Sequence, residues 1–222
     1  MRISCKILSF VLFLFFLLHQ AYAFGQTPYY PEKIWAGKSA SAVGMEQVLL
    51  DSAVALAIGS ENKVERDLRI ANLKAYAREP DYTIPGPMKE RGGPAGLIIK
   101  NGYIVAQWGD IERVDMTFSV TKSYLSTVAG LAIDKGLIKD VNDPVNRYVW
   151  DGTFDGIHNG KVTWKHLLQQ TSDWSGCQFG TCDWADRPPK DGNIEDWKNR
   201  PMVDPGSKFE YNDTRVNLLA YS

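Results

Sequence analysis

The sequence is poor in cysteine and histidine and has almost no excess of charge of either sign. Its 222 residues include 3 cysteines and 3 histidines, and the formal net charge is -1. Binding to the phosphates of nucleic acid needs a basic surface, so this balance predicts no nucleic-acid partner. Internal repeats and low-complexity tracts are also lacking, and the length suits one domain with a sizeable core.

The one long hydrophobic run, Ile7–Leu18, follows the basic residues Arg2 and Lys6 and precedes Ala21-Tyr22-Ala23. This order is typical of a secretory signal. We predict a signal peptide over residues 1–23, cleaved after Ala23. A periplasmic or secreted domain over residues 24–222 then has no membrane contact. The alternative is a membrane anchor, but these 12 residues span roughly 18 Å as a helix, against about 30 Å for a bilayer core.

Two cysteines remain beyond this leader, Cys177 and Cys182 in the segment GCQFGTC. An oxidising compartment allows such a close pair to form a disulfide. The alternative is a metal site, but a histidine or third cysteine nearby is lacking. We predict a small loop-closing disulfide, no metal and no organic cofactor.

The first half of the chain predicts helices and one hairpin. Residues 45–79 have the spacing of one or two amphipathic helices. The apolar residues that set this spacing are Val48, Leu49, Ala53 and Leu56. Two apolar runs flank Asn101-Gly102, which is the strongest short hairpin signal. A single hairpin is too little sheet for an independent β layer.

Three more helices are expected in the second half of the chain. Residues 118–136 predict a long buried helix, which Lys135 and Gly136 close. A shorter helix follows Thr163, its expected N-cap, and another begins near Asp213, which is able to cap it. Residues 172–206, rich in Trp, Pro, Gly and Asp, form a long irregular stretch of the kind that usually carries function.

Ser119 and Lys122 form a Ser-x-x-Lys motif at the start of the long predicted helix. Residues i and i+3 share a helix face, so the amine lies within reach of the hydroxyl. The helix dipole and the Ser119 N–H supply parts of an oxyanion hole. Apolar neighbours predict a lowered pKa for Lys122, which suits a base that takes the serine proton. These neighbours are Met116, Phe118, Val120, Tyr124 and Leu125.

The motif has a plainer alternative, in which Ser119 is only an N-cap and Lys122 a solvated residue of the first turn. A second copy of the motif, Ser60-Glu61-Asn62-Lys63, lies in a charged segment. We expect that copy to have no catalytic role, which shows how little the bare spacing means.

Three segments resemble one family, in the family's order. They are DMTFSVTKSYLSTVAGLAIDKGLIKDVNDPVNRYV, VTWKHLLQQTSDWSG and DPGSKFEYNDTRVNLLAYS. They are similar to the serine β-lactamase and penicillin-binding protein superfamily, nearest to its class C β-lactamase and esterase branch. The whole pattern also resembles aminohexanoate-oligomer hydrolases. The resemblance spans residues 95–222 and implies an α+β fold of the β-lactamase/transpeptidase type, with a helical subdomain and an antiparallel sheet.

By this resemblance Ser119 is the acylated nucleophile, Lys122 its base, and Tyr211 the residue that passes a proton to the leaving group. The alternative for Tyr211 is a core aromatic. These roles imply a serine hydrolase that forms an acyl-enzyme on an ester, amide or lactam carbonyl. Its partners would be small-molecule or peptide-like acyl substrates; the sequence leaves the oligomeric state open.

The sequence departs from the family pattern at Asp213, where the Tyr-x-Asn motif has asparagine. An ionised aspartate only accepts hydrogen bonds, and facing the site it would stabilise the charged form of Lys122. It would also repel a substrate carboxylate and attract an amine or amide N–H. We therefore name Asp213 as a substrate-binding candidate; the alternative is that it only caps the next helix.

The family's third motif, Lys-Thr-Gly or His-x-Gly, is expected on a strand after the tyrosine, with the second oxyanion N–H. His158-Asn159-Gly160 matches by letters but precedes Tyr211 in a polar loop, and His166 is expected to be structural. The last predicted helix reaches Ser222 with an apolar face and no cap. We therefore expect an N-terminal portion of the fold without its C-terminal strands, and an inactive fragment is one alternative.

A rival function from another class is a non-catalytic member that binds cell-wall fragments or a protein partner. The long irregular stretch contains Trp174, Trp184 and Trp197. Aromatic residues in a long loop suit either a substrate wall or a binding face.

Overall fold

The structure is a computed structural model that describes residues 29–80, 82–84 and 86–222. The predicted leader and its cleavage site lie outside this part. The chain divides into two compact units, which we describe one at a time. The first holds the described residues up to Lys63 and Gly92–Arg113, and the second holds Val64–Arg91 and Val114–Ser222. The elements are helices and two small antiparallel sheets, as expected of an α+β protein.

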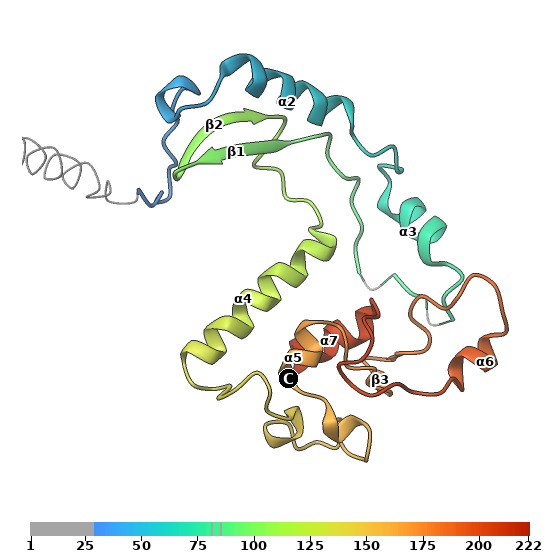
Figure 1. The fold of residues 1–222 in the computed structure, drawn as a ribbon. Coiled ribbons are helices and arrows are strands. Elements are labelled where there is room, and N and C mark those ends of the chain that lie inside the picture. Colours follow the sequence, from blue (N-terminus) through green and yellow to red (C-terminus); the bar gives the residue numbers. More distant parts are fainter. Residues whose placement is uncertain (1–28, 81, 85) are drawn as a thin grey trace, which may run out of the picture. The chain divides into compact units, whose positions relative to one another are not determined.

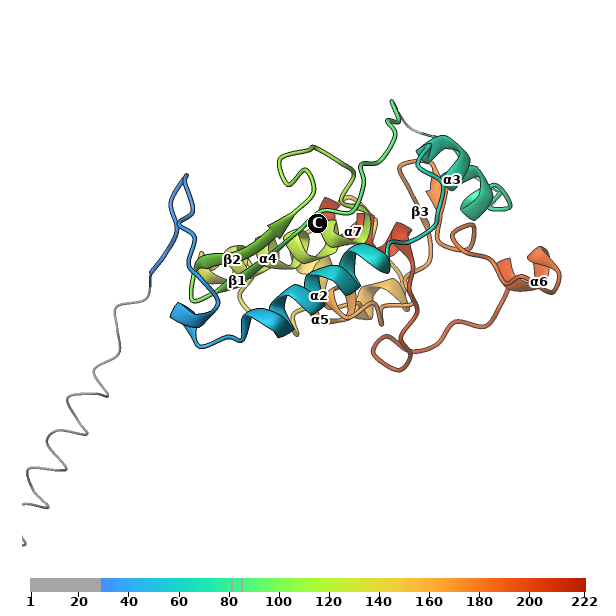
Figure 2. The ribbon, with the colours of Figure 1, turned by 90° about the horizontal axis from the view of Figure 1, so that it is seen from above.

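The first unit is a β hairpin with a helix beside it. β1 (Gly96–Lys100) pairs antiparallel with β2 (Tyr103–Trp108). Asn101 and Gly102 in the turn have φ values of 53° and 83°, and a two-residue hairpin turn of this kind needs both to be positive. The predicted hairpin is confirmed. α2 (Gln47–Gly59), preceded by the 3-10 turn η1 (Ser41–Val43), runs alongside it in both views (Figure 1, Figure 2).

The prediction for α2 named the wrong face. Val48, Leu49 and Leu56 are exposed, and Leu50 is the buried residue of this helix. In the sequence QVLLDSAVALAIG, apolar residues occur on every side of the helix, so their spacing does not define one buried face. A second helix, α3 (Leu68–Tyr76), belongs to the second unit and is capped by Asp67.

Three helices of the second unit contribute to a hydrophobic core. α5 (Trp164–Leu168) and α7 (Asp213–Tyr221) contact each other at its centre (Figure 1). α4 (Thr121–Asp134) follows the 3-10 turn η2 (Phe118–Val120) and contributes Leu125, Ala132 and Ile133. The buried residues of the core are Ile138, Val145, Phe154, Val162, Trp164, Leu167, Trp174, Leu218 and Leu219.

The long helix α4 is confirmed, with Gly136 at φ 70° beyond its end. Its predicted burial is wrong, because only one face meets the core. Ala129 is the buried residue of this helix, whereas Tyr124, Val128 and Leu131 are exposed. Within the described residues, no helix is long and apolar enough to cross a membrane.

Of the two predicted N-cap residues, one caps its helix and the other does not. Thr163 caps α5 as predicted, accepting from the N–H of His166 at 3.3 Å. The cap of α7 is Asn212, which accepts from the N–H of Arg215 at 3.0 Å. The expectation that Asp213 caps α7 is therefore wrong. Asn212 has the extended backbone that a cap requires, whereas Asp213 is already the first helical residue.

The stretch from 172 to 206 contains more regular structure than predicted. β3 (Cys177–Gln178) pairs with β4 (Thr181–Cys182), and a disulfide joins Cys177 to Cys182 across this short hairpin. The one-turn helix α6 (Ile194–Lys198) follows. Two further 3-10 turns, η3 (Val145–Arg147) and η4 (Asn159–Lys161), lie on the connection from α4 to α5.

A buried charge network ties α7 to this stretch. Arg215 is 2% exposed, and its Nη2 lies 2.9 Å from Asp173 Oδ1 and 3.1 Å from Asp183 Oδ2. Asp173 also accepts from Arg200 and from the N–H of Val203. Burial opposes ionisation of Asp173, but these donors and the charge of Arg215 lower its pKa. Buried charges are costly unless paired, so the network fixes the start of α7 against the loop.

Replacing Arg215 with methionine is expected to lower the free energy of unfolding by about 3–5 kcal/mol, because it leaves buried carboxylates without their partner. Urea unfolding measures this change. The control is Lys161→Met, which removes an exposed pair with Asp204 at 3.1 Å and is expected to change stability by less than about 1 kcal/mol. Equal effects of the two variants would contradict the structural role of the network.

Removing the disulfide with Cys177→Ala and Cys182→Ala is expected to lower the free energy of unfolding by about 2 kcal/mol. The bond closes a loop with a sequence separation of 5, and loop-closure entropy gives roughly that value for so short a loop. Denaturant unfolding of the double variant checks the expectation. A double variant as stable as the parent chain would mean that the loop is restrained equally well without the bond.

Candidate active site

Ser119 and Tyr211 meet although 92 residues separate them. Their hydroxyl oxygens lie 2.6 Å apart, a hydrogen-bond distance. Ser119 lies in the η2 turn at the start of α4, directly after Phe118, whose φ is 46°. A positive φ is unfavourable for so bulky a residue, and such strain concentrates at functional sites. The turn presents an exposed Ser119 to the half-buried Tyr211.

Lys122, one turn further along α4, is held by Asp213. The Lys122 Nζ donates to Asp213 Oδ1 at 2.7 Å and lies 4.8 Å from the centre of the Tyr211 ring. Asp213 thus faces the site, which answers the question left open by the sequence. Lys122 and Asp213 thus form one cluster with Ser119 and Tyr211 at the starts of α4 and α7.

The expected lowering of the Lys122 pKa is wrong. Burial alone would lower it, but the hydrogen bond to Asp213 and the proximity of Tyr211 raise the pKa of Lys122 above its usual value of 10.5. The predicted apolar shield is thin, because Met116, Phe118, Val120 and Tyr124 are all exposed. Lys122 is therefore an ammonium at neutral pH, paired with an ionised Asp213. Burial opposes ionisation of Asp213, but Lys122 and Arg187 lower its pKa below 3.8.

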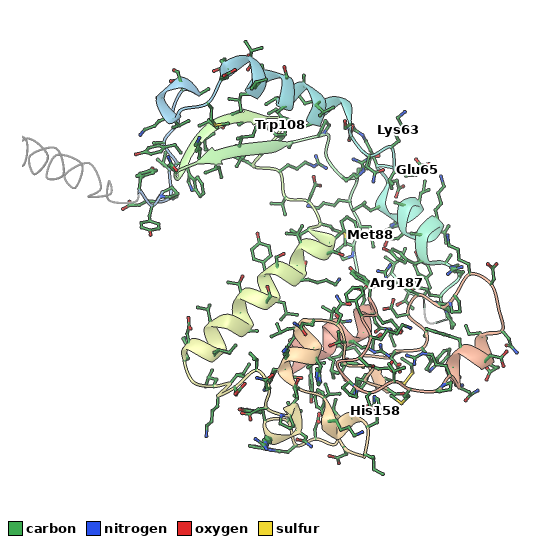
Figure 3. All side chains as sticks on the ribbon, viewed as in Figure 1. Lys63, Glu65, Met88, Trp108, His158 and Arg187 are labelled. Atoms are coloured by element: carbon green, nitrogen blue, oxygen red, sulfur yellow. A yellow bond between two sulfur atoms is a disulfide. The ribbon has the colours of Figure 1, made fainter. Side chains whose placement is uncertain are left out.

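The structure adds two residues that the sequence did not single out. The Nη2 of Arg187 donates to Asp213 Oδ2 at 2.6 Å, and the N–H of Asp213 donates to Asp186. Figure 3 labels Arg187 beside the ribbon that leads into α7. The sequence indicated Arg187 only indirectly. A second cation would balance the charge of an aspartate next to the lysine, but the loop contains several basic residues, and the sequence does not distinguish among them.

The two histidines in question lie apart from this cluster. His158 donates from Nε2 to the carbonyl oxygen of Asp173 at 2.9 Å, and Figure 3 shows it well away from Arg187. The Nδ1 of His166 accepts from the N–H of Thr163 at 3.2 Å and completes a capping box, which is a structural role. In the part of the chain described, no group of three or more His, Cys, Asp or Glu could hold a metal ion.

The tryptophans of the long stretch do not form a common exposed face. Trp174 is 2% exposed and belongs to the core. Trp197 donates from Nε1 to the carbonyl oxygen of Trp184 at 3.0 Å, and both are half-buried. Trp174 therefore cannot be part of the predicted aromatic binding face, because its side chain is buried.

Two hollows border the cluster, and Asp213 lines both. One, of about 400 Å³, lies between α4 and α7 and is mainly apolar, with Leu125, Val128 and Val216 among its walls. The other, of about 330 Å³, is polar, with Tyr76, Glu79 and Asp186 among its walls. Both hollows thus reach the cluster at Asp213, and the apolar one is also lined by Lys122 and Phe118.

Comparison with known proteins identifies the family of the chain. The Beta-lactamase family model matches residues 86–221, which is more than half of the chain. The chain therefore belongs to the beta-lactamase family, within the serine β-lactamase and penicillin-binding protein superfamily. No protein among the curated sequences matches the chain. The α+β organisation is compatible with this family, and the class C branch remains a prediction.

Because of the Lys122–Asp213 pair, we expect the stability of the fold to depend on pH in both the acidic and the alkaline range. The folded pKa of Asp213 lies below 3.8, so its contribution is present above that value and is lost as pH falls through the folded pKa. The folded pKa of Lys122 lies above 10.5, so its contribution is full below that value and is lost as pH rises through the folded pKa.

The measurement is the difference in unfolding free energy between the parent chain and Asp213→Asn. We expect it to be constant between about pH 5 and 9 and to shrink in acid. Asp204→Asn, which removes an exposed pair with Lys161, is the matched control and should change little. A difference for Asp213→Asn that stays constant down to about pH 2 would contradict the pairing.

Proposed function

We propose that the chain belongs to an exported serine hydrolase that acts through an acyl-enzyme on an ester, amide or lactam carbonyl. The observation that carries this proposal is the 2.6 Å contact between Ser119 Oγ and Tyr211 Oη, beside the Lys122 ammonium. Membership of the beta-lactamase family supports the reaction class. The order of residues in the leader supports export.

The Tyr211 oxygen lies within hydrogen-bond distance of the Ser119 hydroxyl and can accept its proton. In the reactive form that we propose, Tyr211 is a phenolate that the Lys122 ammonium stabilises. Because Asp213 holds the proton on Lys122, we propose that the Ser119 proton moves to Tyr211 and not to Lys122. Tyr211 is then the proton acceptor and Lys122 its electrostatic support. This reverses the emphasis of the sequence-based prediction, which made Lys122 the base.

The reaction follows from this arrangement in two halves. The Ser119 oxygen attacks the carbonyl carbon while its proton moves to the Tyr211 oxygen. The tetrahedral intermediate collapses to an acyl-serine, and Tyr211 returns the proton to the departing alcohol or amine. Water then attacks the acyl carbon, gives a proton to Tyr211, and the acid product leaves as Ser119 regains its hydrogen. The helix start at Ser119 offers an N–H and a positive dipole to the developing oxyanion.

The substrate remains a class of carbonyl compounds. A carboxylate close to the nucleophile was expected to repel acidic substrates, but both oxygens of Asp213 are engaged by cations, Lys122 and Arg187. We therefore propose that Asp213 holds the catalytic lysine, and its direct contact with substrate stays a prediction. Esters, anilides and chromogenic lactams should be compared side by side.

Incubation with a fluorophosphonate should add one adduct to the chain, detected by intact mass, and Ser119→Ala should abolish it. Ser60→Ala is the matched control, because Ser60 begins the second Ser-x-x-Lys copy and should not affect labelling. Tyr211→Phe removes the proton acceptor and should slow labelling by about 10²–10⁴-fold. A folded chain that is never labelled, or is labelled equally in Ser119→Ala, would refute the proposal and favour a binding protein.

A further inference from the structure

Arg187 belongs to the charged cluster but has no part in the proposed proton transfers. Its Nη2 lies 2.6 Å from Asp213 Oδ2, and its Nε lies 3.6 Å from Asp186 Oδ1. Its guanidinium carbon lies 4.7 Å from the centre of the Tyr211 ring. One side chain therefore contacts both the carboxylate that holds the lysine and the tyrosine that contacts the nucleophile.

The backbone of Arg187 is fixed in an unfavourable conformation. Its φ of 52° lies in the left-handed region, which few side chains other than glycine adopt. Its N–H donates to Glu79 Oε1 at 3.3 Å, and its guanidinium carbon lies 5.4 Å from the centre of the Tyr76 ring. Such conformations persist where the surroundings determine them, and they cluster at functional sites. Here the surroundings aim the guanidinium at Asp213.

The charges near Lys122 indicate what Arg187 does there. Asp213 accepts from Lys122, and its own N–H donates to Asp186, so the carboxylate that holds the ammonium has a second carboxylate beside it. Arg187 adds a second cation and balances them. Without it, the catalytic pair would lie beside an excess of negative charge, which opposes the loss of a proton.

We propose that Arg187 is a positioning residue that balances the charge of Asp213 and thereby supports the transfer of the Ser119 proton to Tyr211. This inference rests on the proposed function. Arginine suits the place because its planar fork reaches two carboxylates while it lies over an aromatic ring.

Every element packed against Arg187 contributes charged or titratable groups. These are Lys122 from α4, Tyr76 and Glu79 from α3 and the residues after it, Asp186 from the same loop, and Tyr211 and Asp213 from the start of α7. Burial and the nearby Asp186 raise the pKa of Glu79, and burial also raises that of Asp186. Removing Asp213 as well as Arg187 therefore separates the proposed pair from these other acids.

The experiment is the rate of fluorophosphonate labelling of Ser119 as a function of pH. Arg187→Gln removes a positive charge beside the site, which disfavours the loss of a proton there. The rising limb of the labelling rate should therefore move to higher pH by about 1–3 units. At pH 7 the labelling rate should fall at least about tenfold. Adding Asp213→Asn to Arg187→Gln should return the rising limb toward its original pH. Arg187→Lys keeps the positive charge and should leave the limb close to its original pH.

The matched control is Arg147→Gln. Arg147 pairs with Asp143 at 2.9 Å on an exposed surface, and its loss should leave the pH profile unchanged. Thermal unfolding establishes that each variant is folded. A merely structural role for Arg187 would lower thermal stability without moving the limb. That result, or a double variant no better than Arg187→Gln, would overturn the inference.

A second readout separates this inference from the proposed function. If the parent chain is not labelled at all, the proposed function fails, and the charge balance is still decided by an NMR titration of the Asp213 carboxyl carbon, assigned with Asp213→Asn. Removal of Arg187 should raise the pKa of Asp213, because a cation that favours the carboxylate is lost. An unchanged Asp213 titration in Arg187→Gln would overturn the inference independently of activity.

Discussion

The candidate site depends on the two ion pairs of the Asp213 carboxylate. It holds the Lys122 ammonium on α4 with one oxygen and the Arg187 guanidinium with the other. Both cations lie less than 5 Å from the centre of the Tyr211 ring, at 4.8 and 4.7 Å. A single carboxylate thus joins the nucleophile helix to the irregular loop beside the tyrosine, and it raises the pKa of Lys122.

This carboxylate is itself positioned by the core of the second unit. Asn212 caps α7, and Arg215 binds Asp173 and Asp183 in a buried network that anchors the helix start. Leu218 and Leu219, one turn further, pack into the hydrophobic core. The precision of the site therefore comes from a short helix whose first turn is polar and bonded, and whose second turn is apolar and packed. The same loop that supplies Arg187 is bound to this helix by the network.

The sequence predicted the parts of this arrangement that depend on local geometry. The i, i+3 spacing placed Ser119 and Lys122 on one helix face, and the family resemblance gave them their catalytic roles. The hairpin at Asn101-Gly102 follows from its need for positive φ. Tyr211 followed from the family resemblance alone. Arg187 could not be predicted, because its contact with Asp213 spans 26 residues of irregular chain and depends on a left-handed backbone. The raised Lys122 pKa was missed for the same reason, since its cause is a partner from α7.

The central claim is that Ser119 becomes acylated with Tyr211 as its proton acceptor. The most direct measurement is acid-quenched peptide mapping after brief incubation with a short-chain p-nitrophenyl ester, beside the release of p-nitrophenol. The account predicts stoichiometric release and an acyl group on the peptide that contains Ser119, with both much slower in Tyr211→Phe. An acyl group on another residue, or a Tyr211→Phe variant that reacts at the original rate, would contradict it.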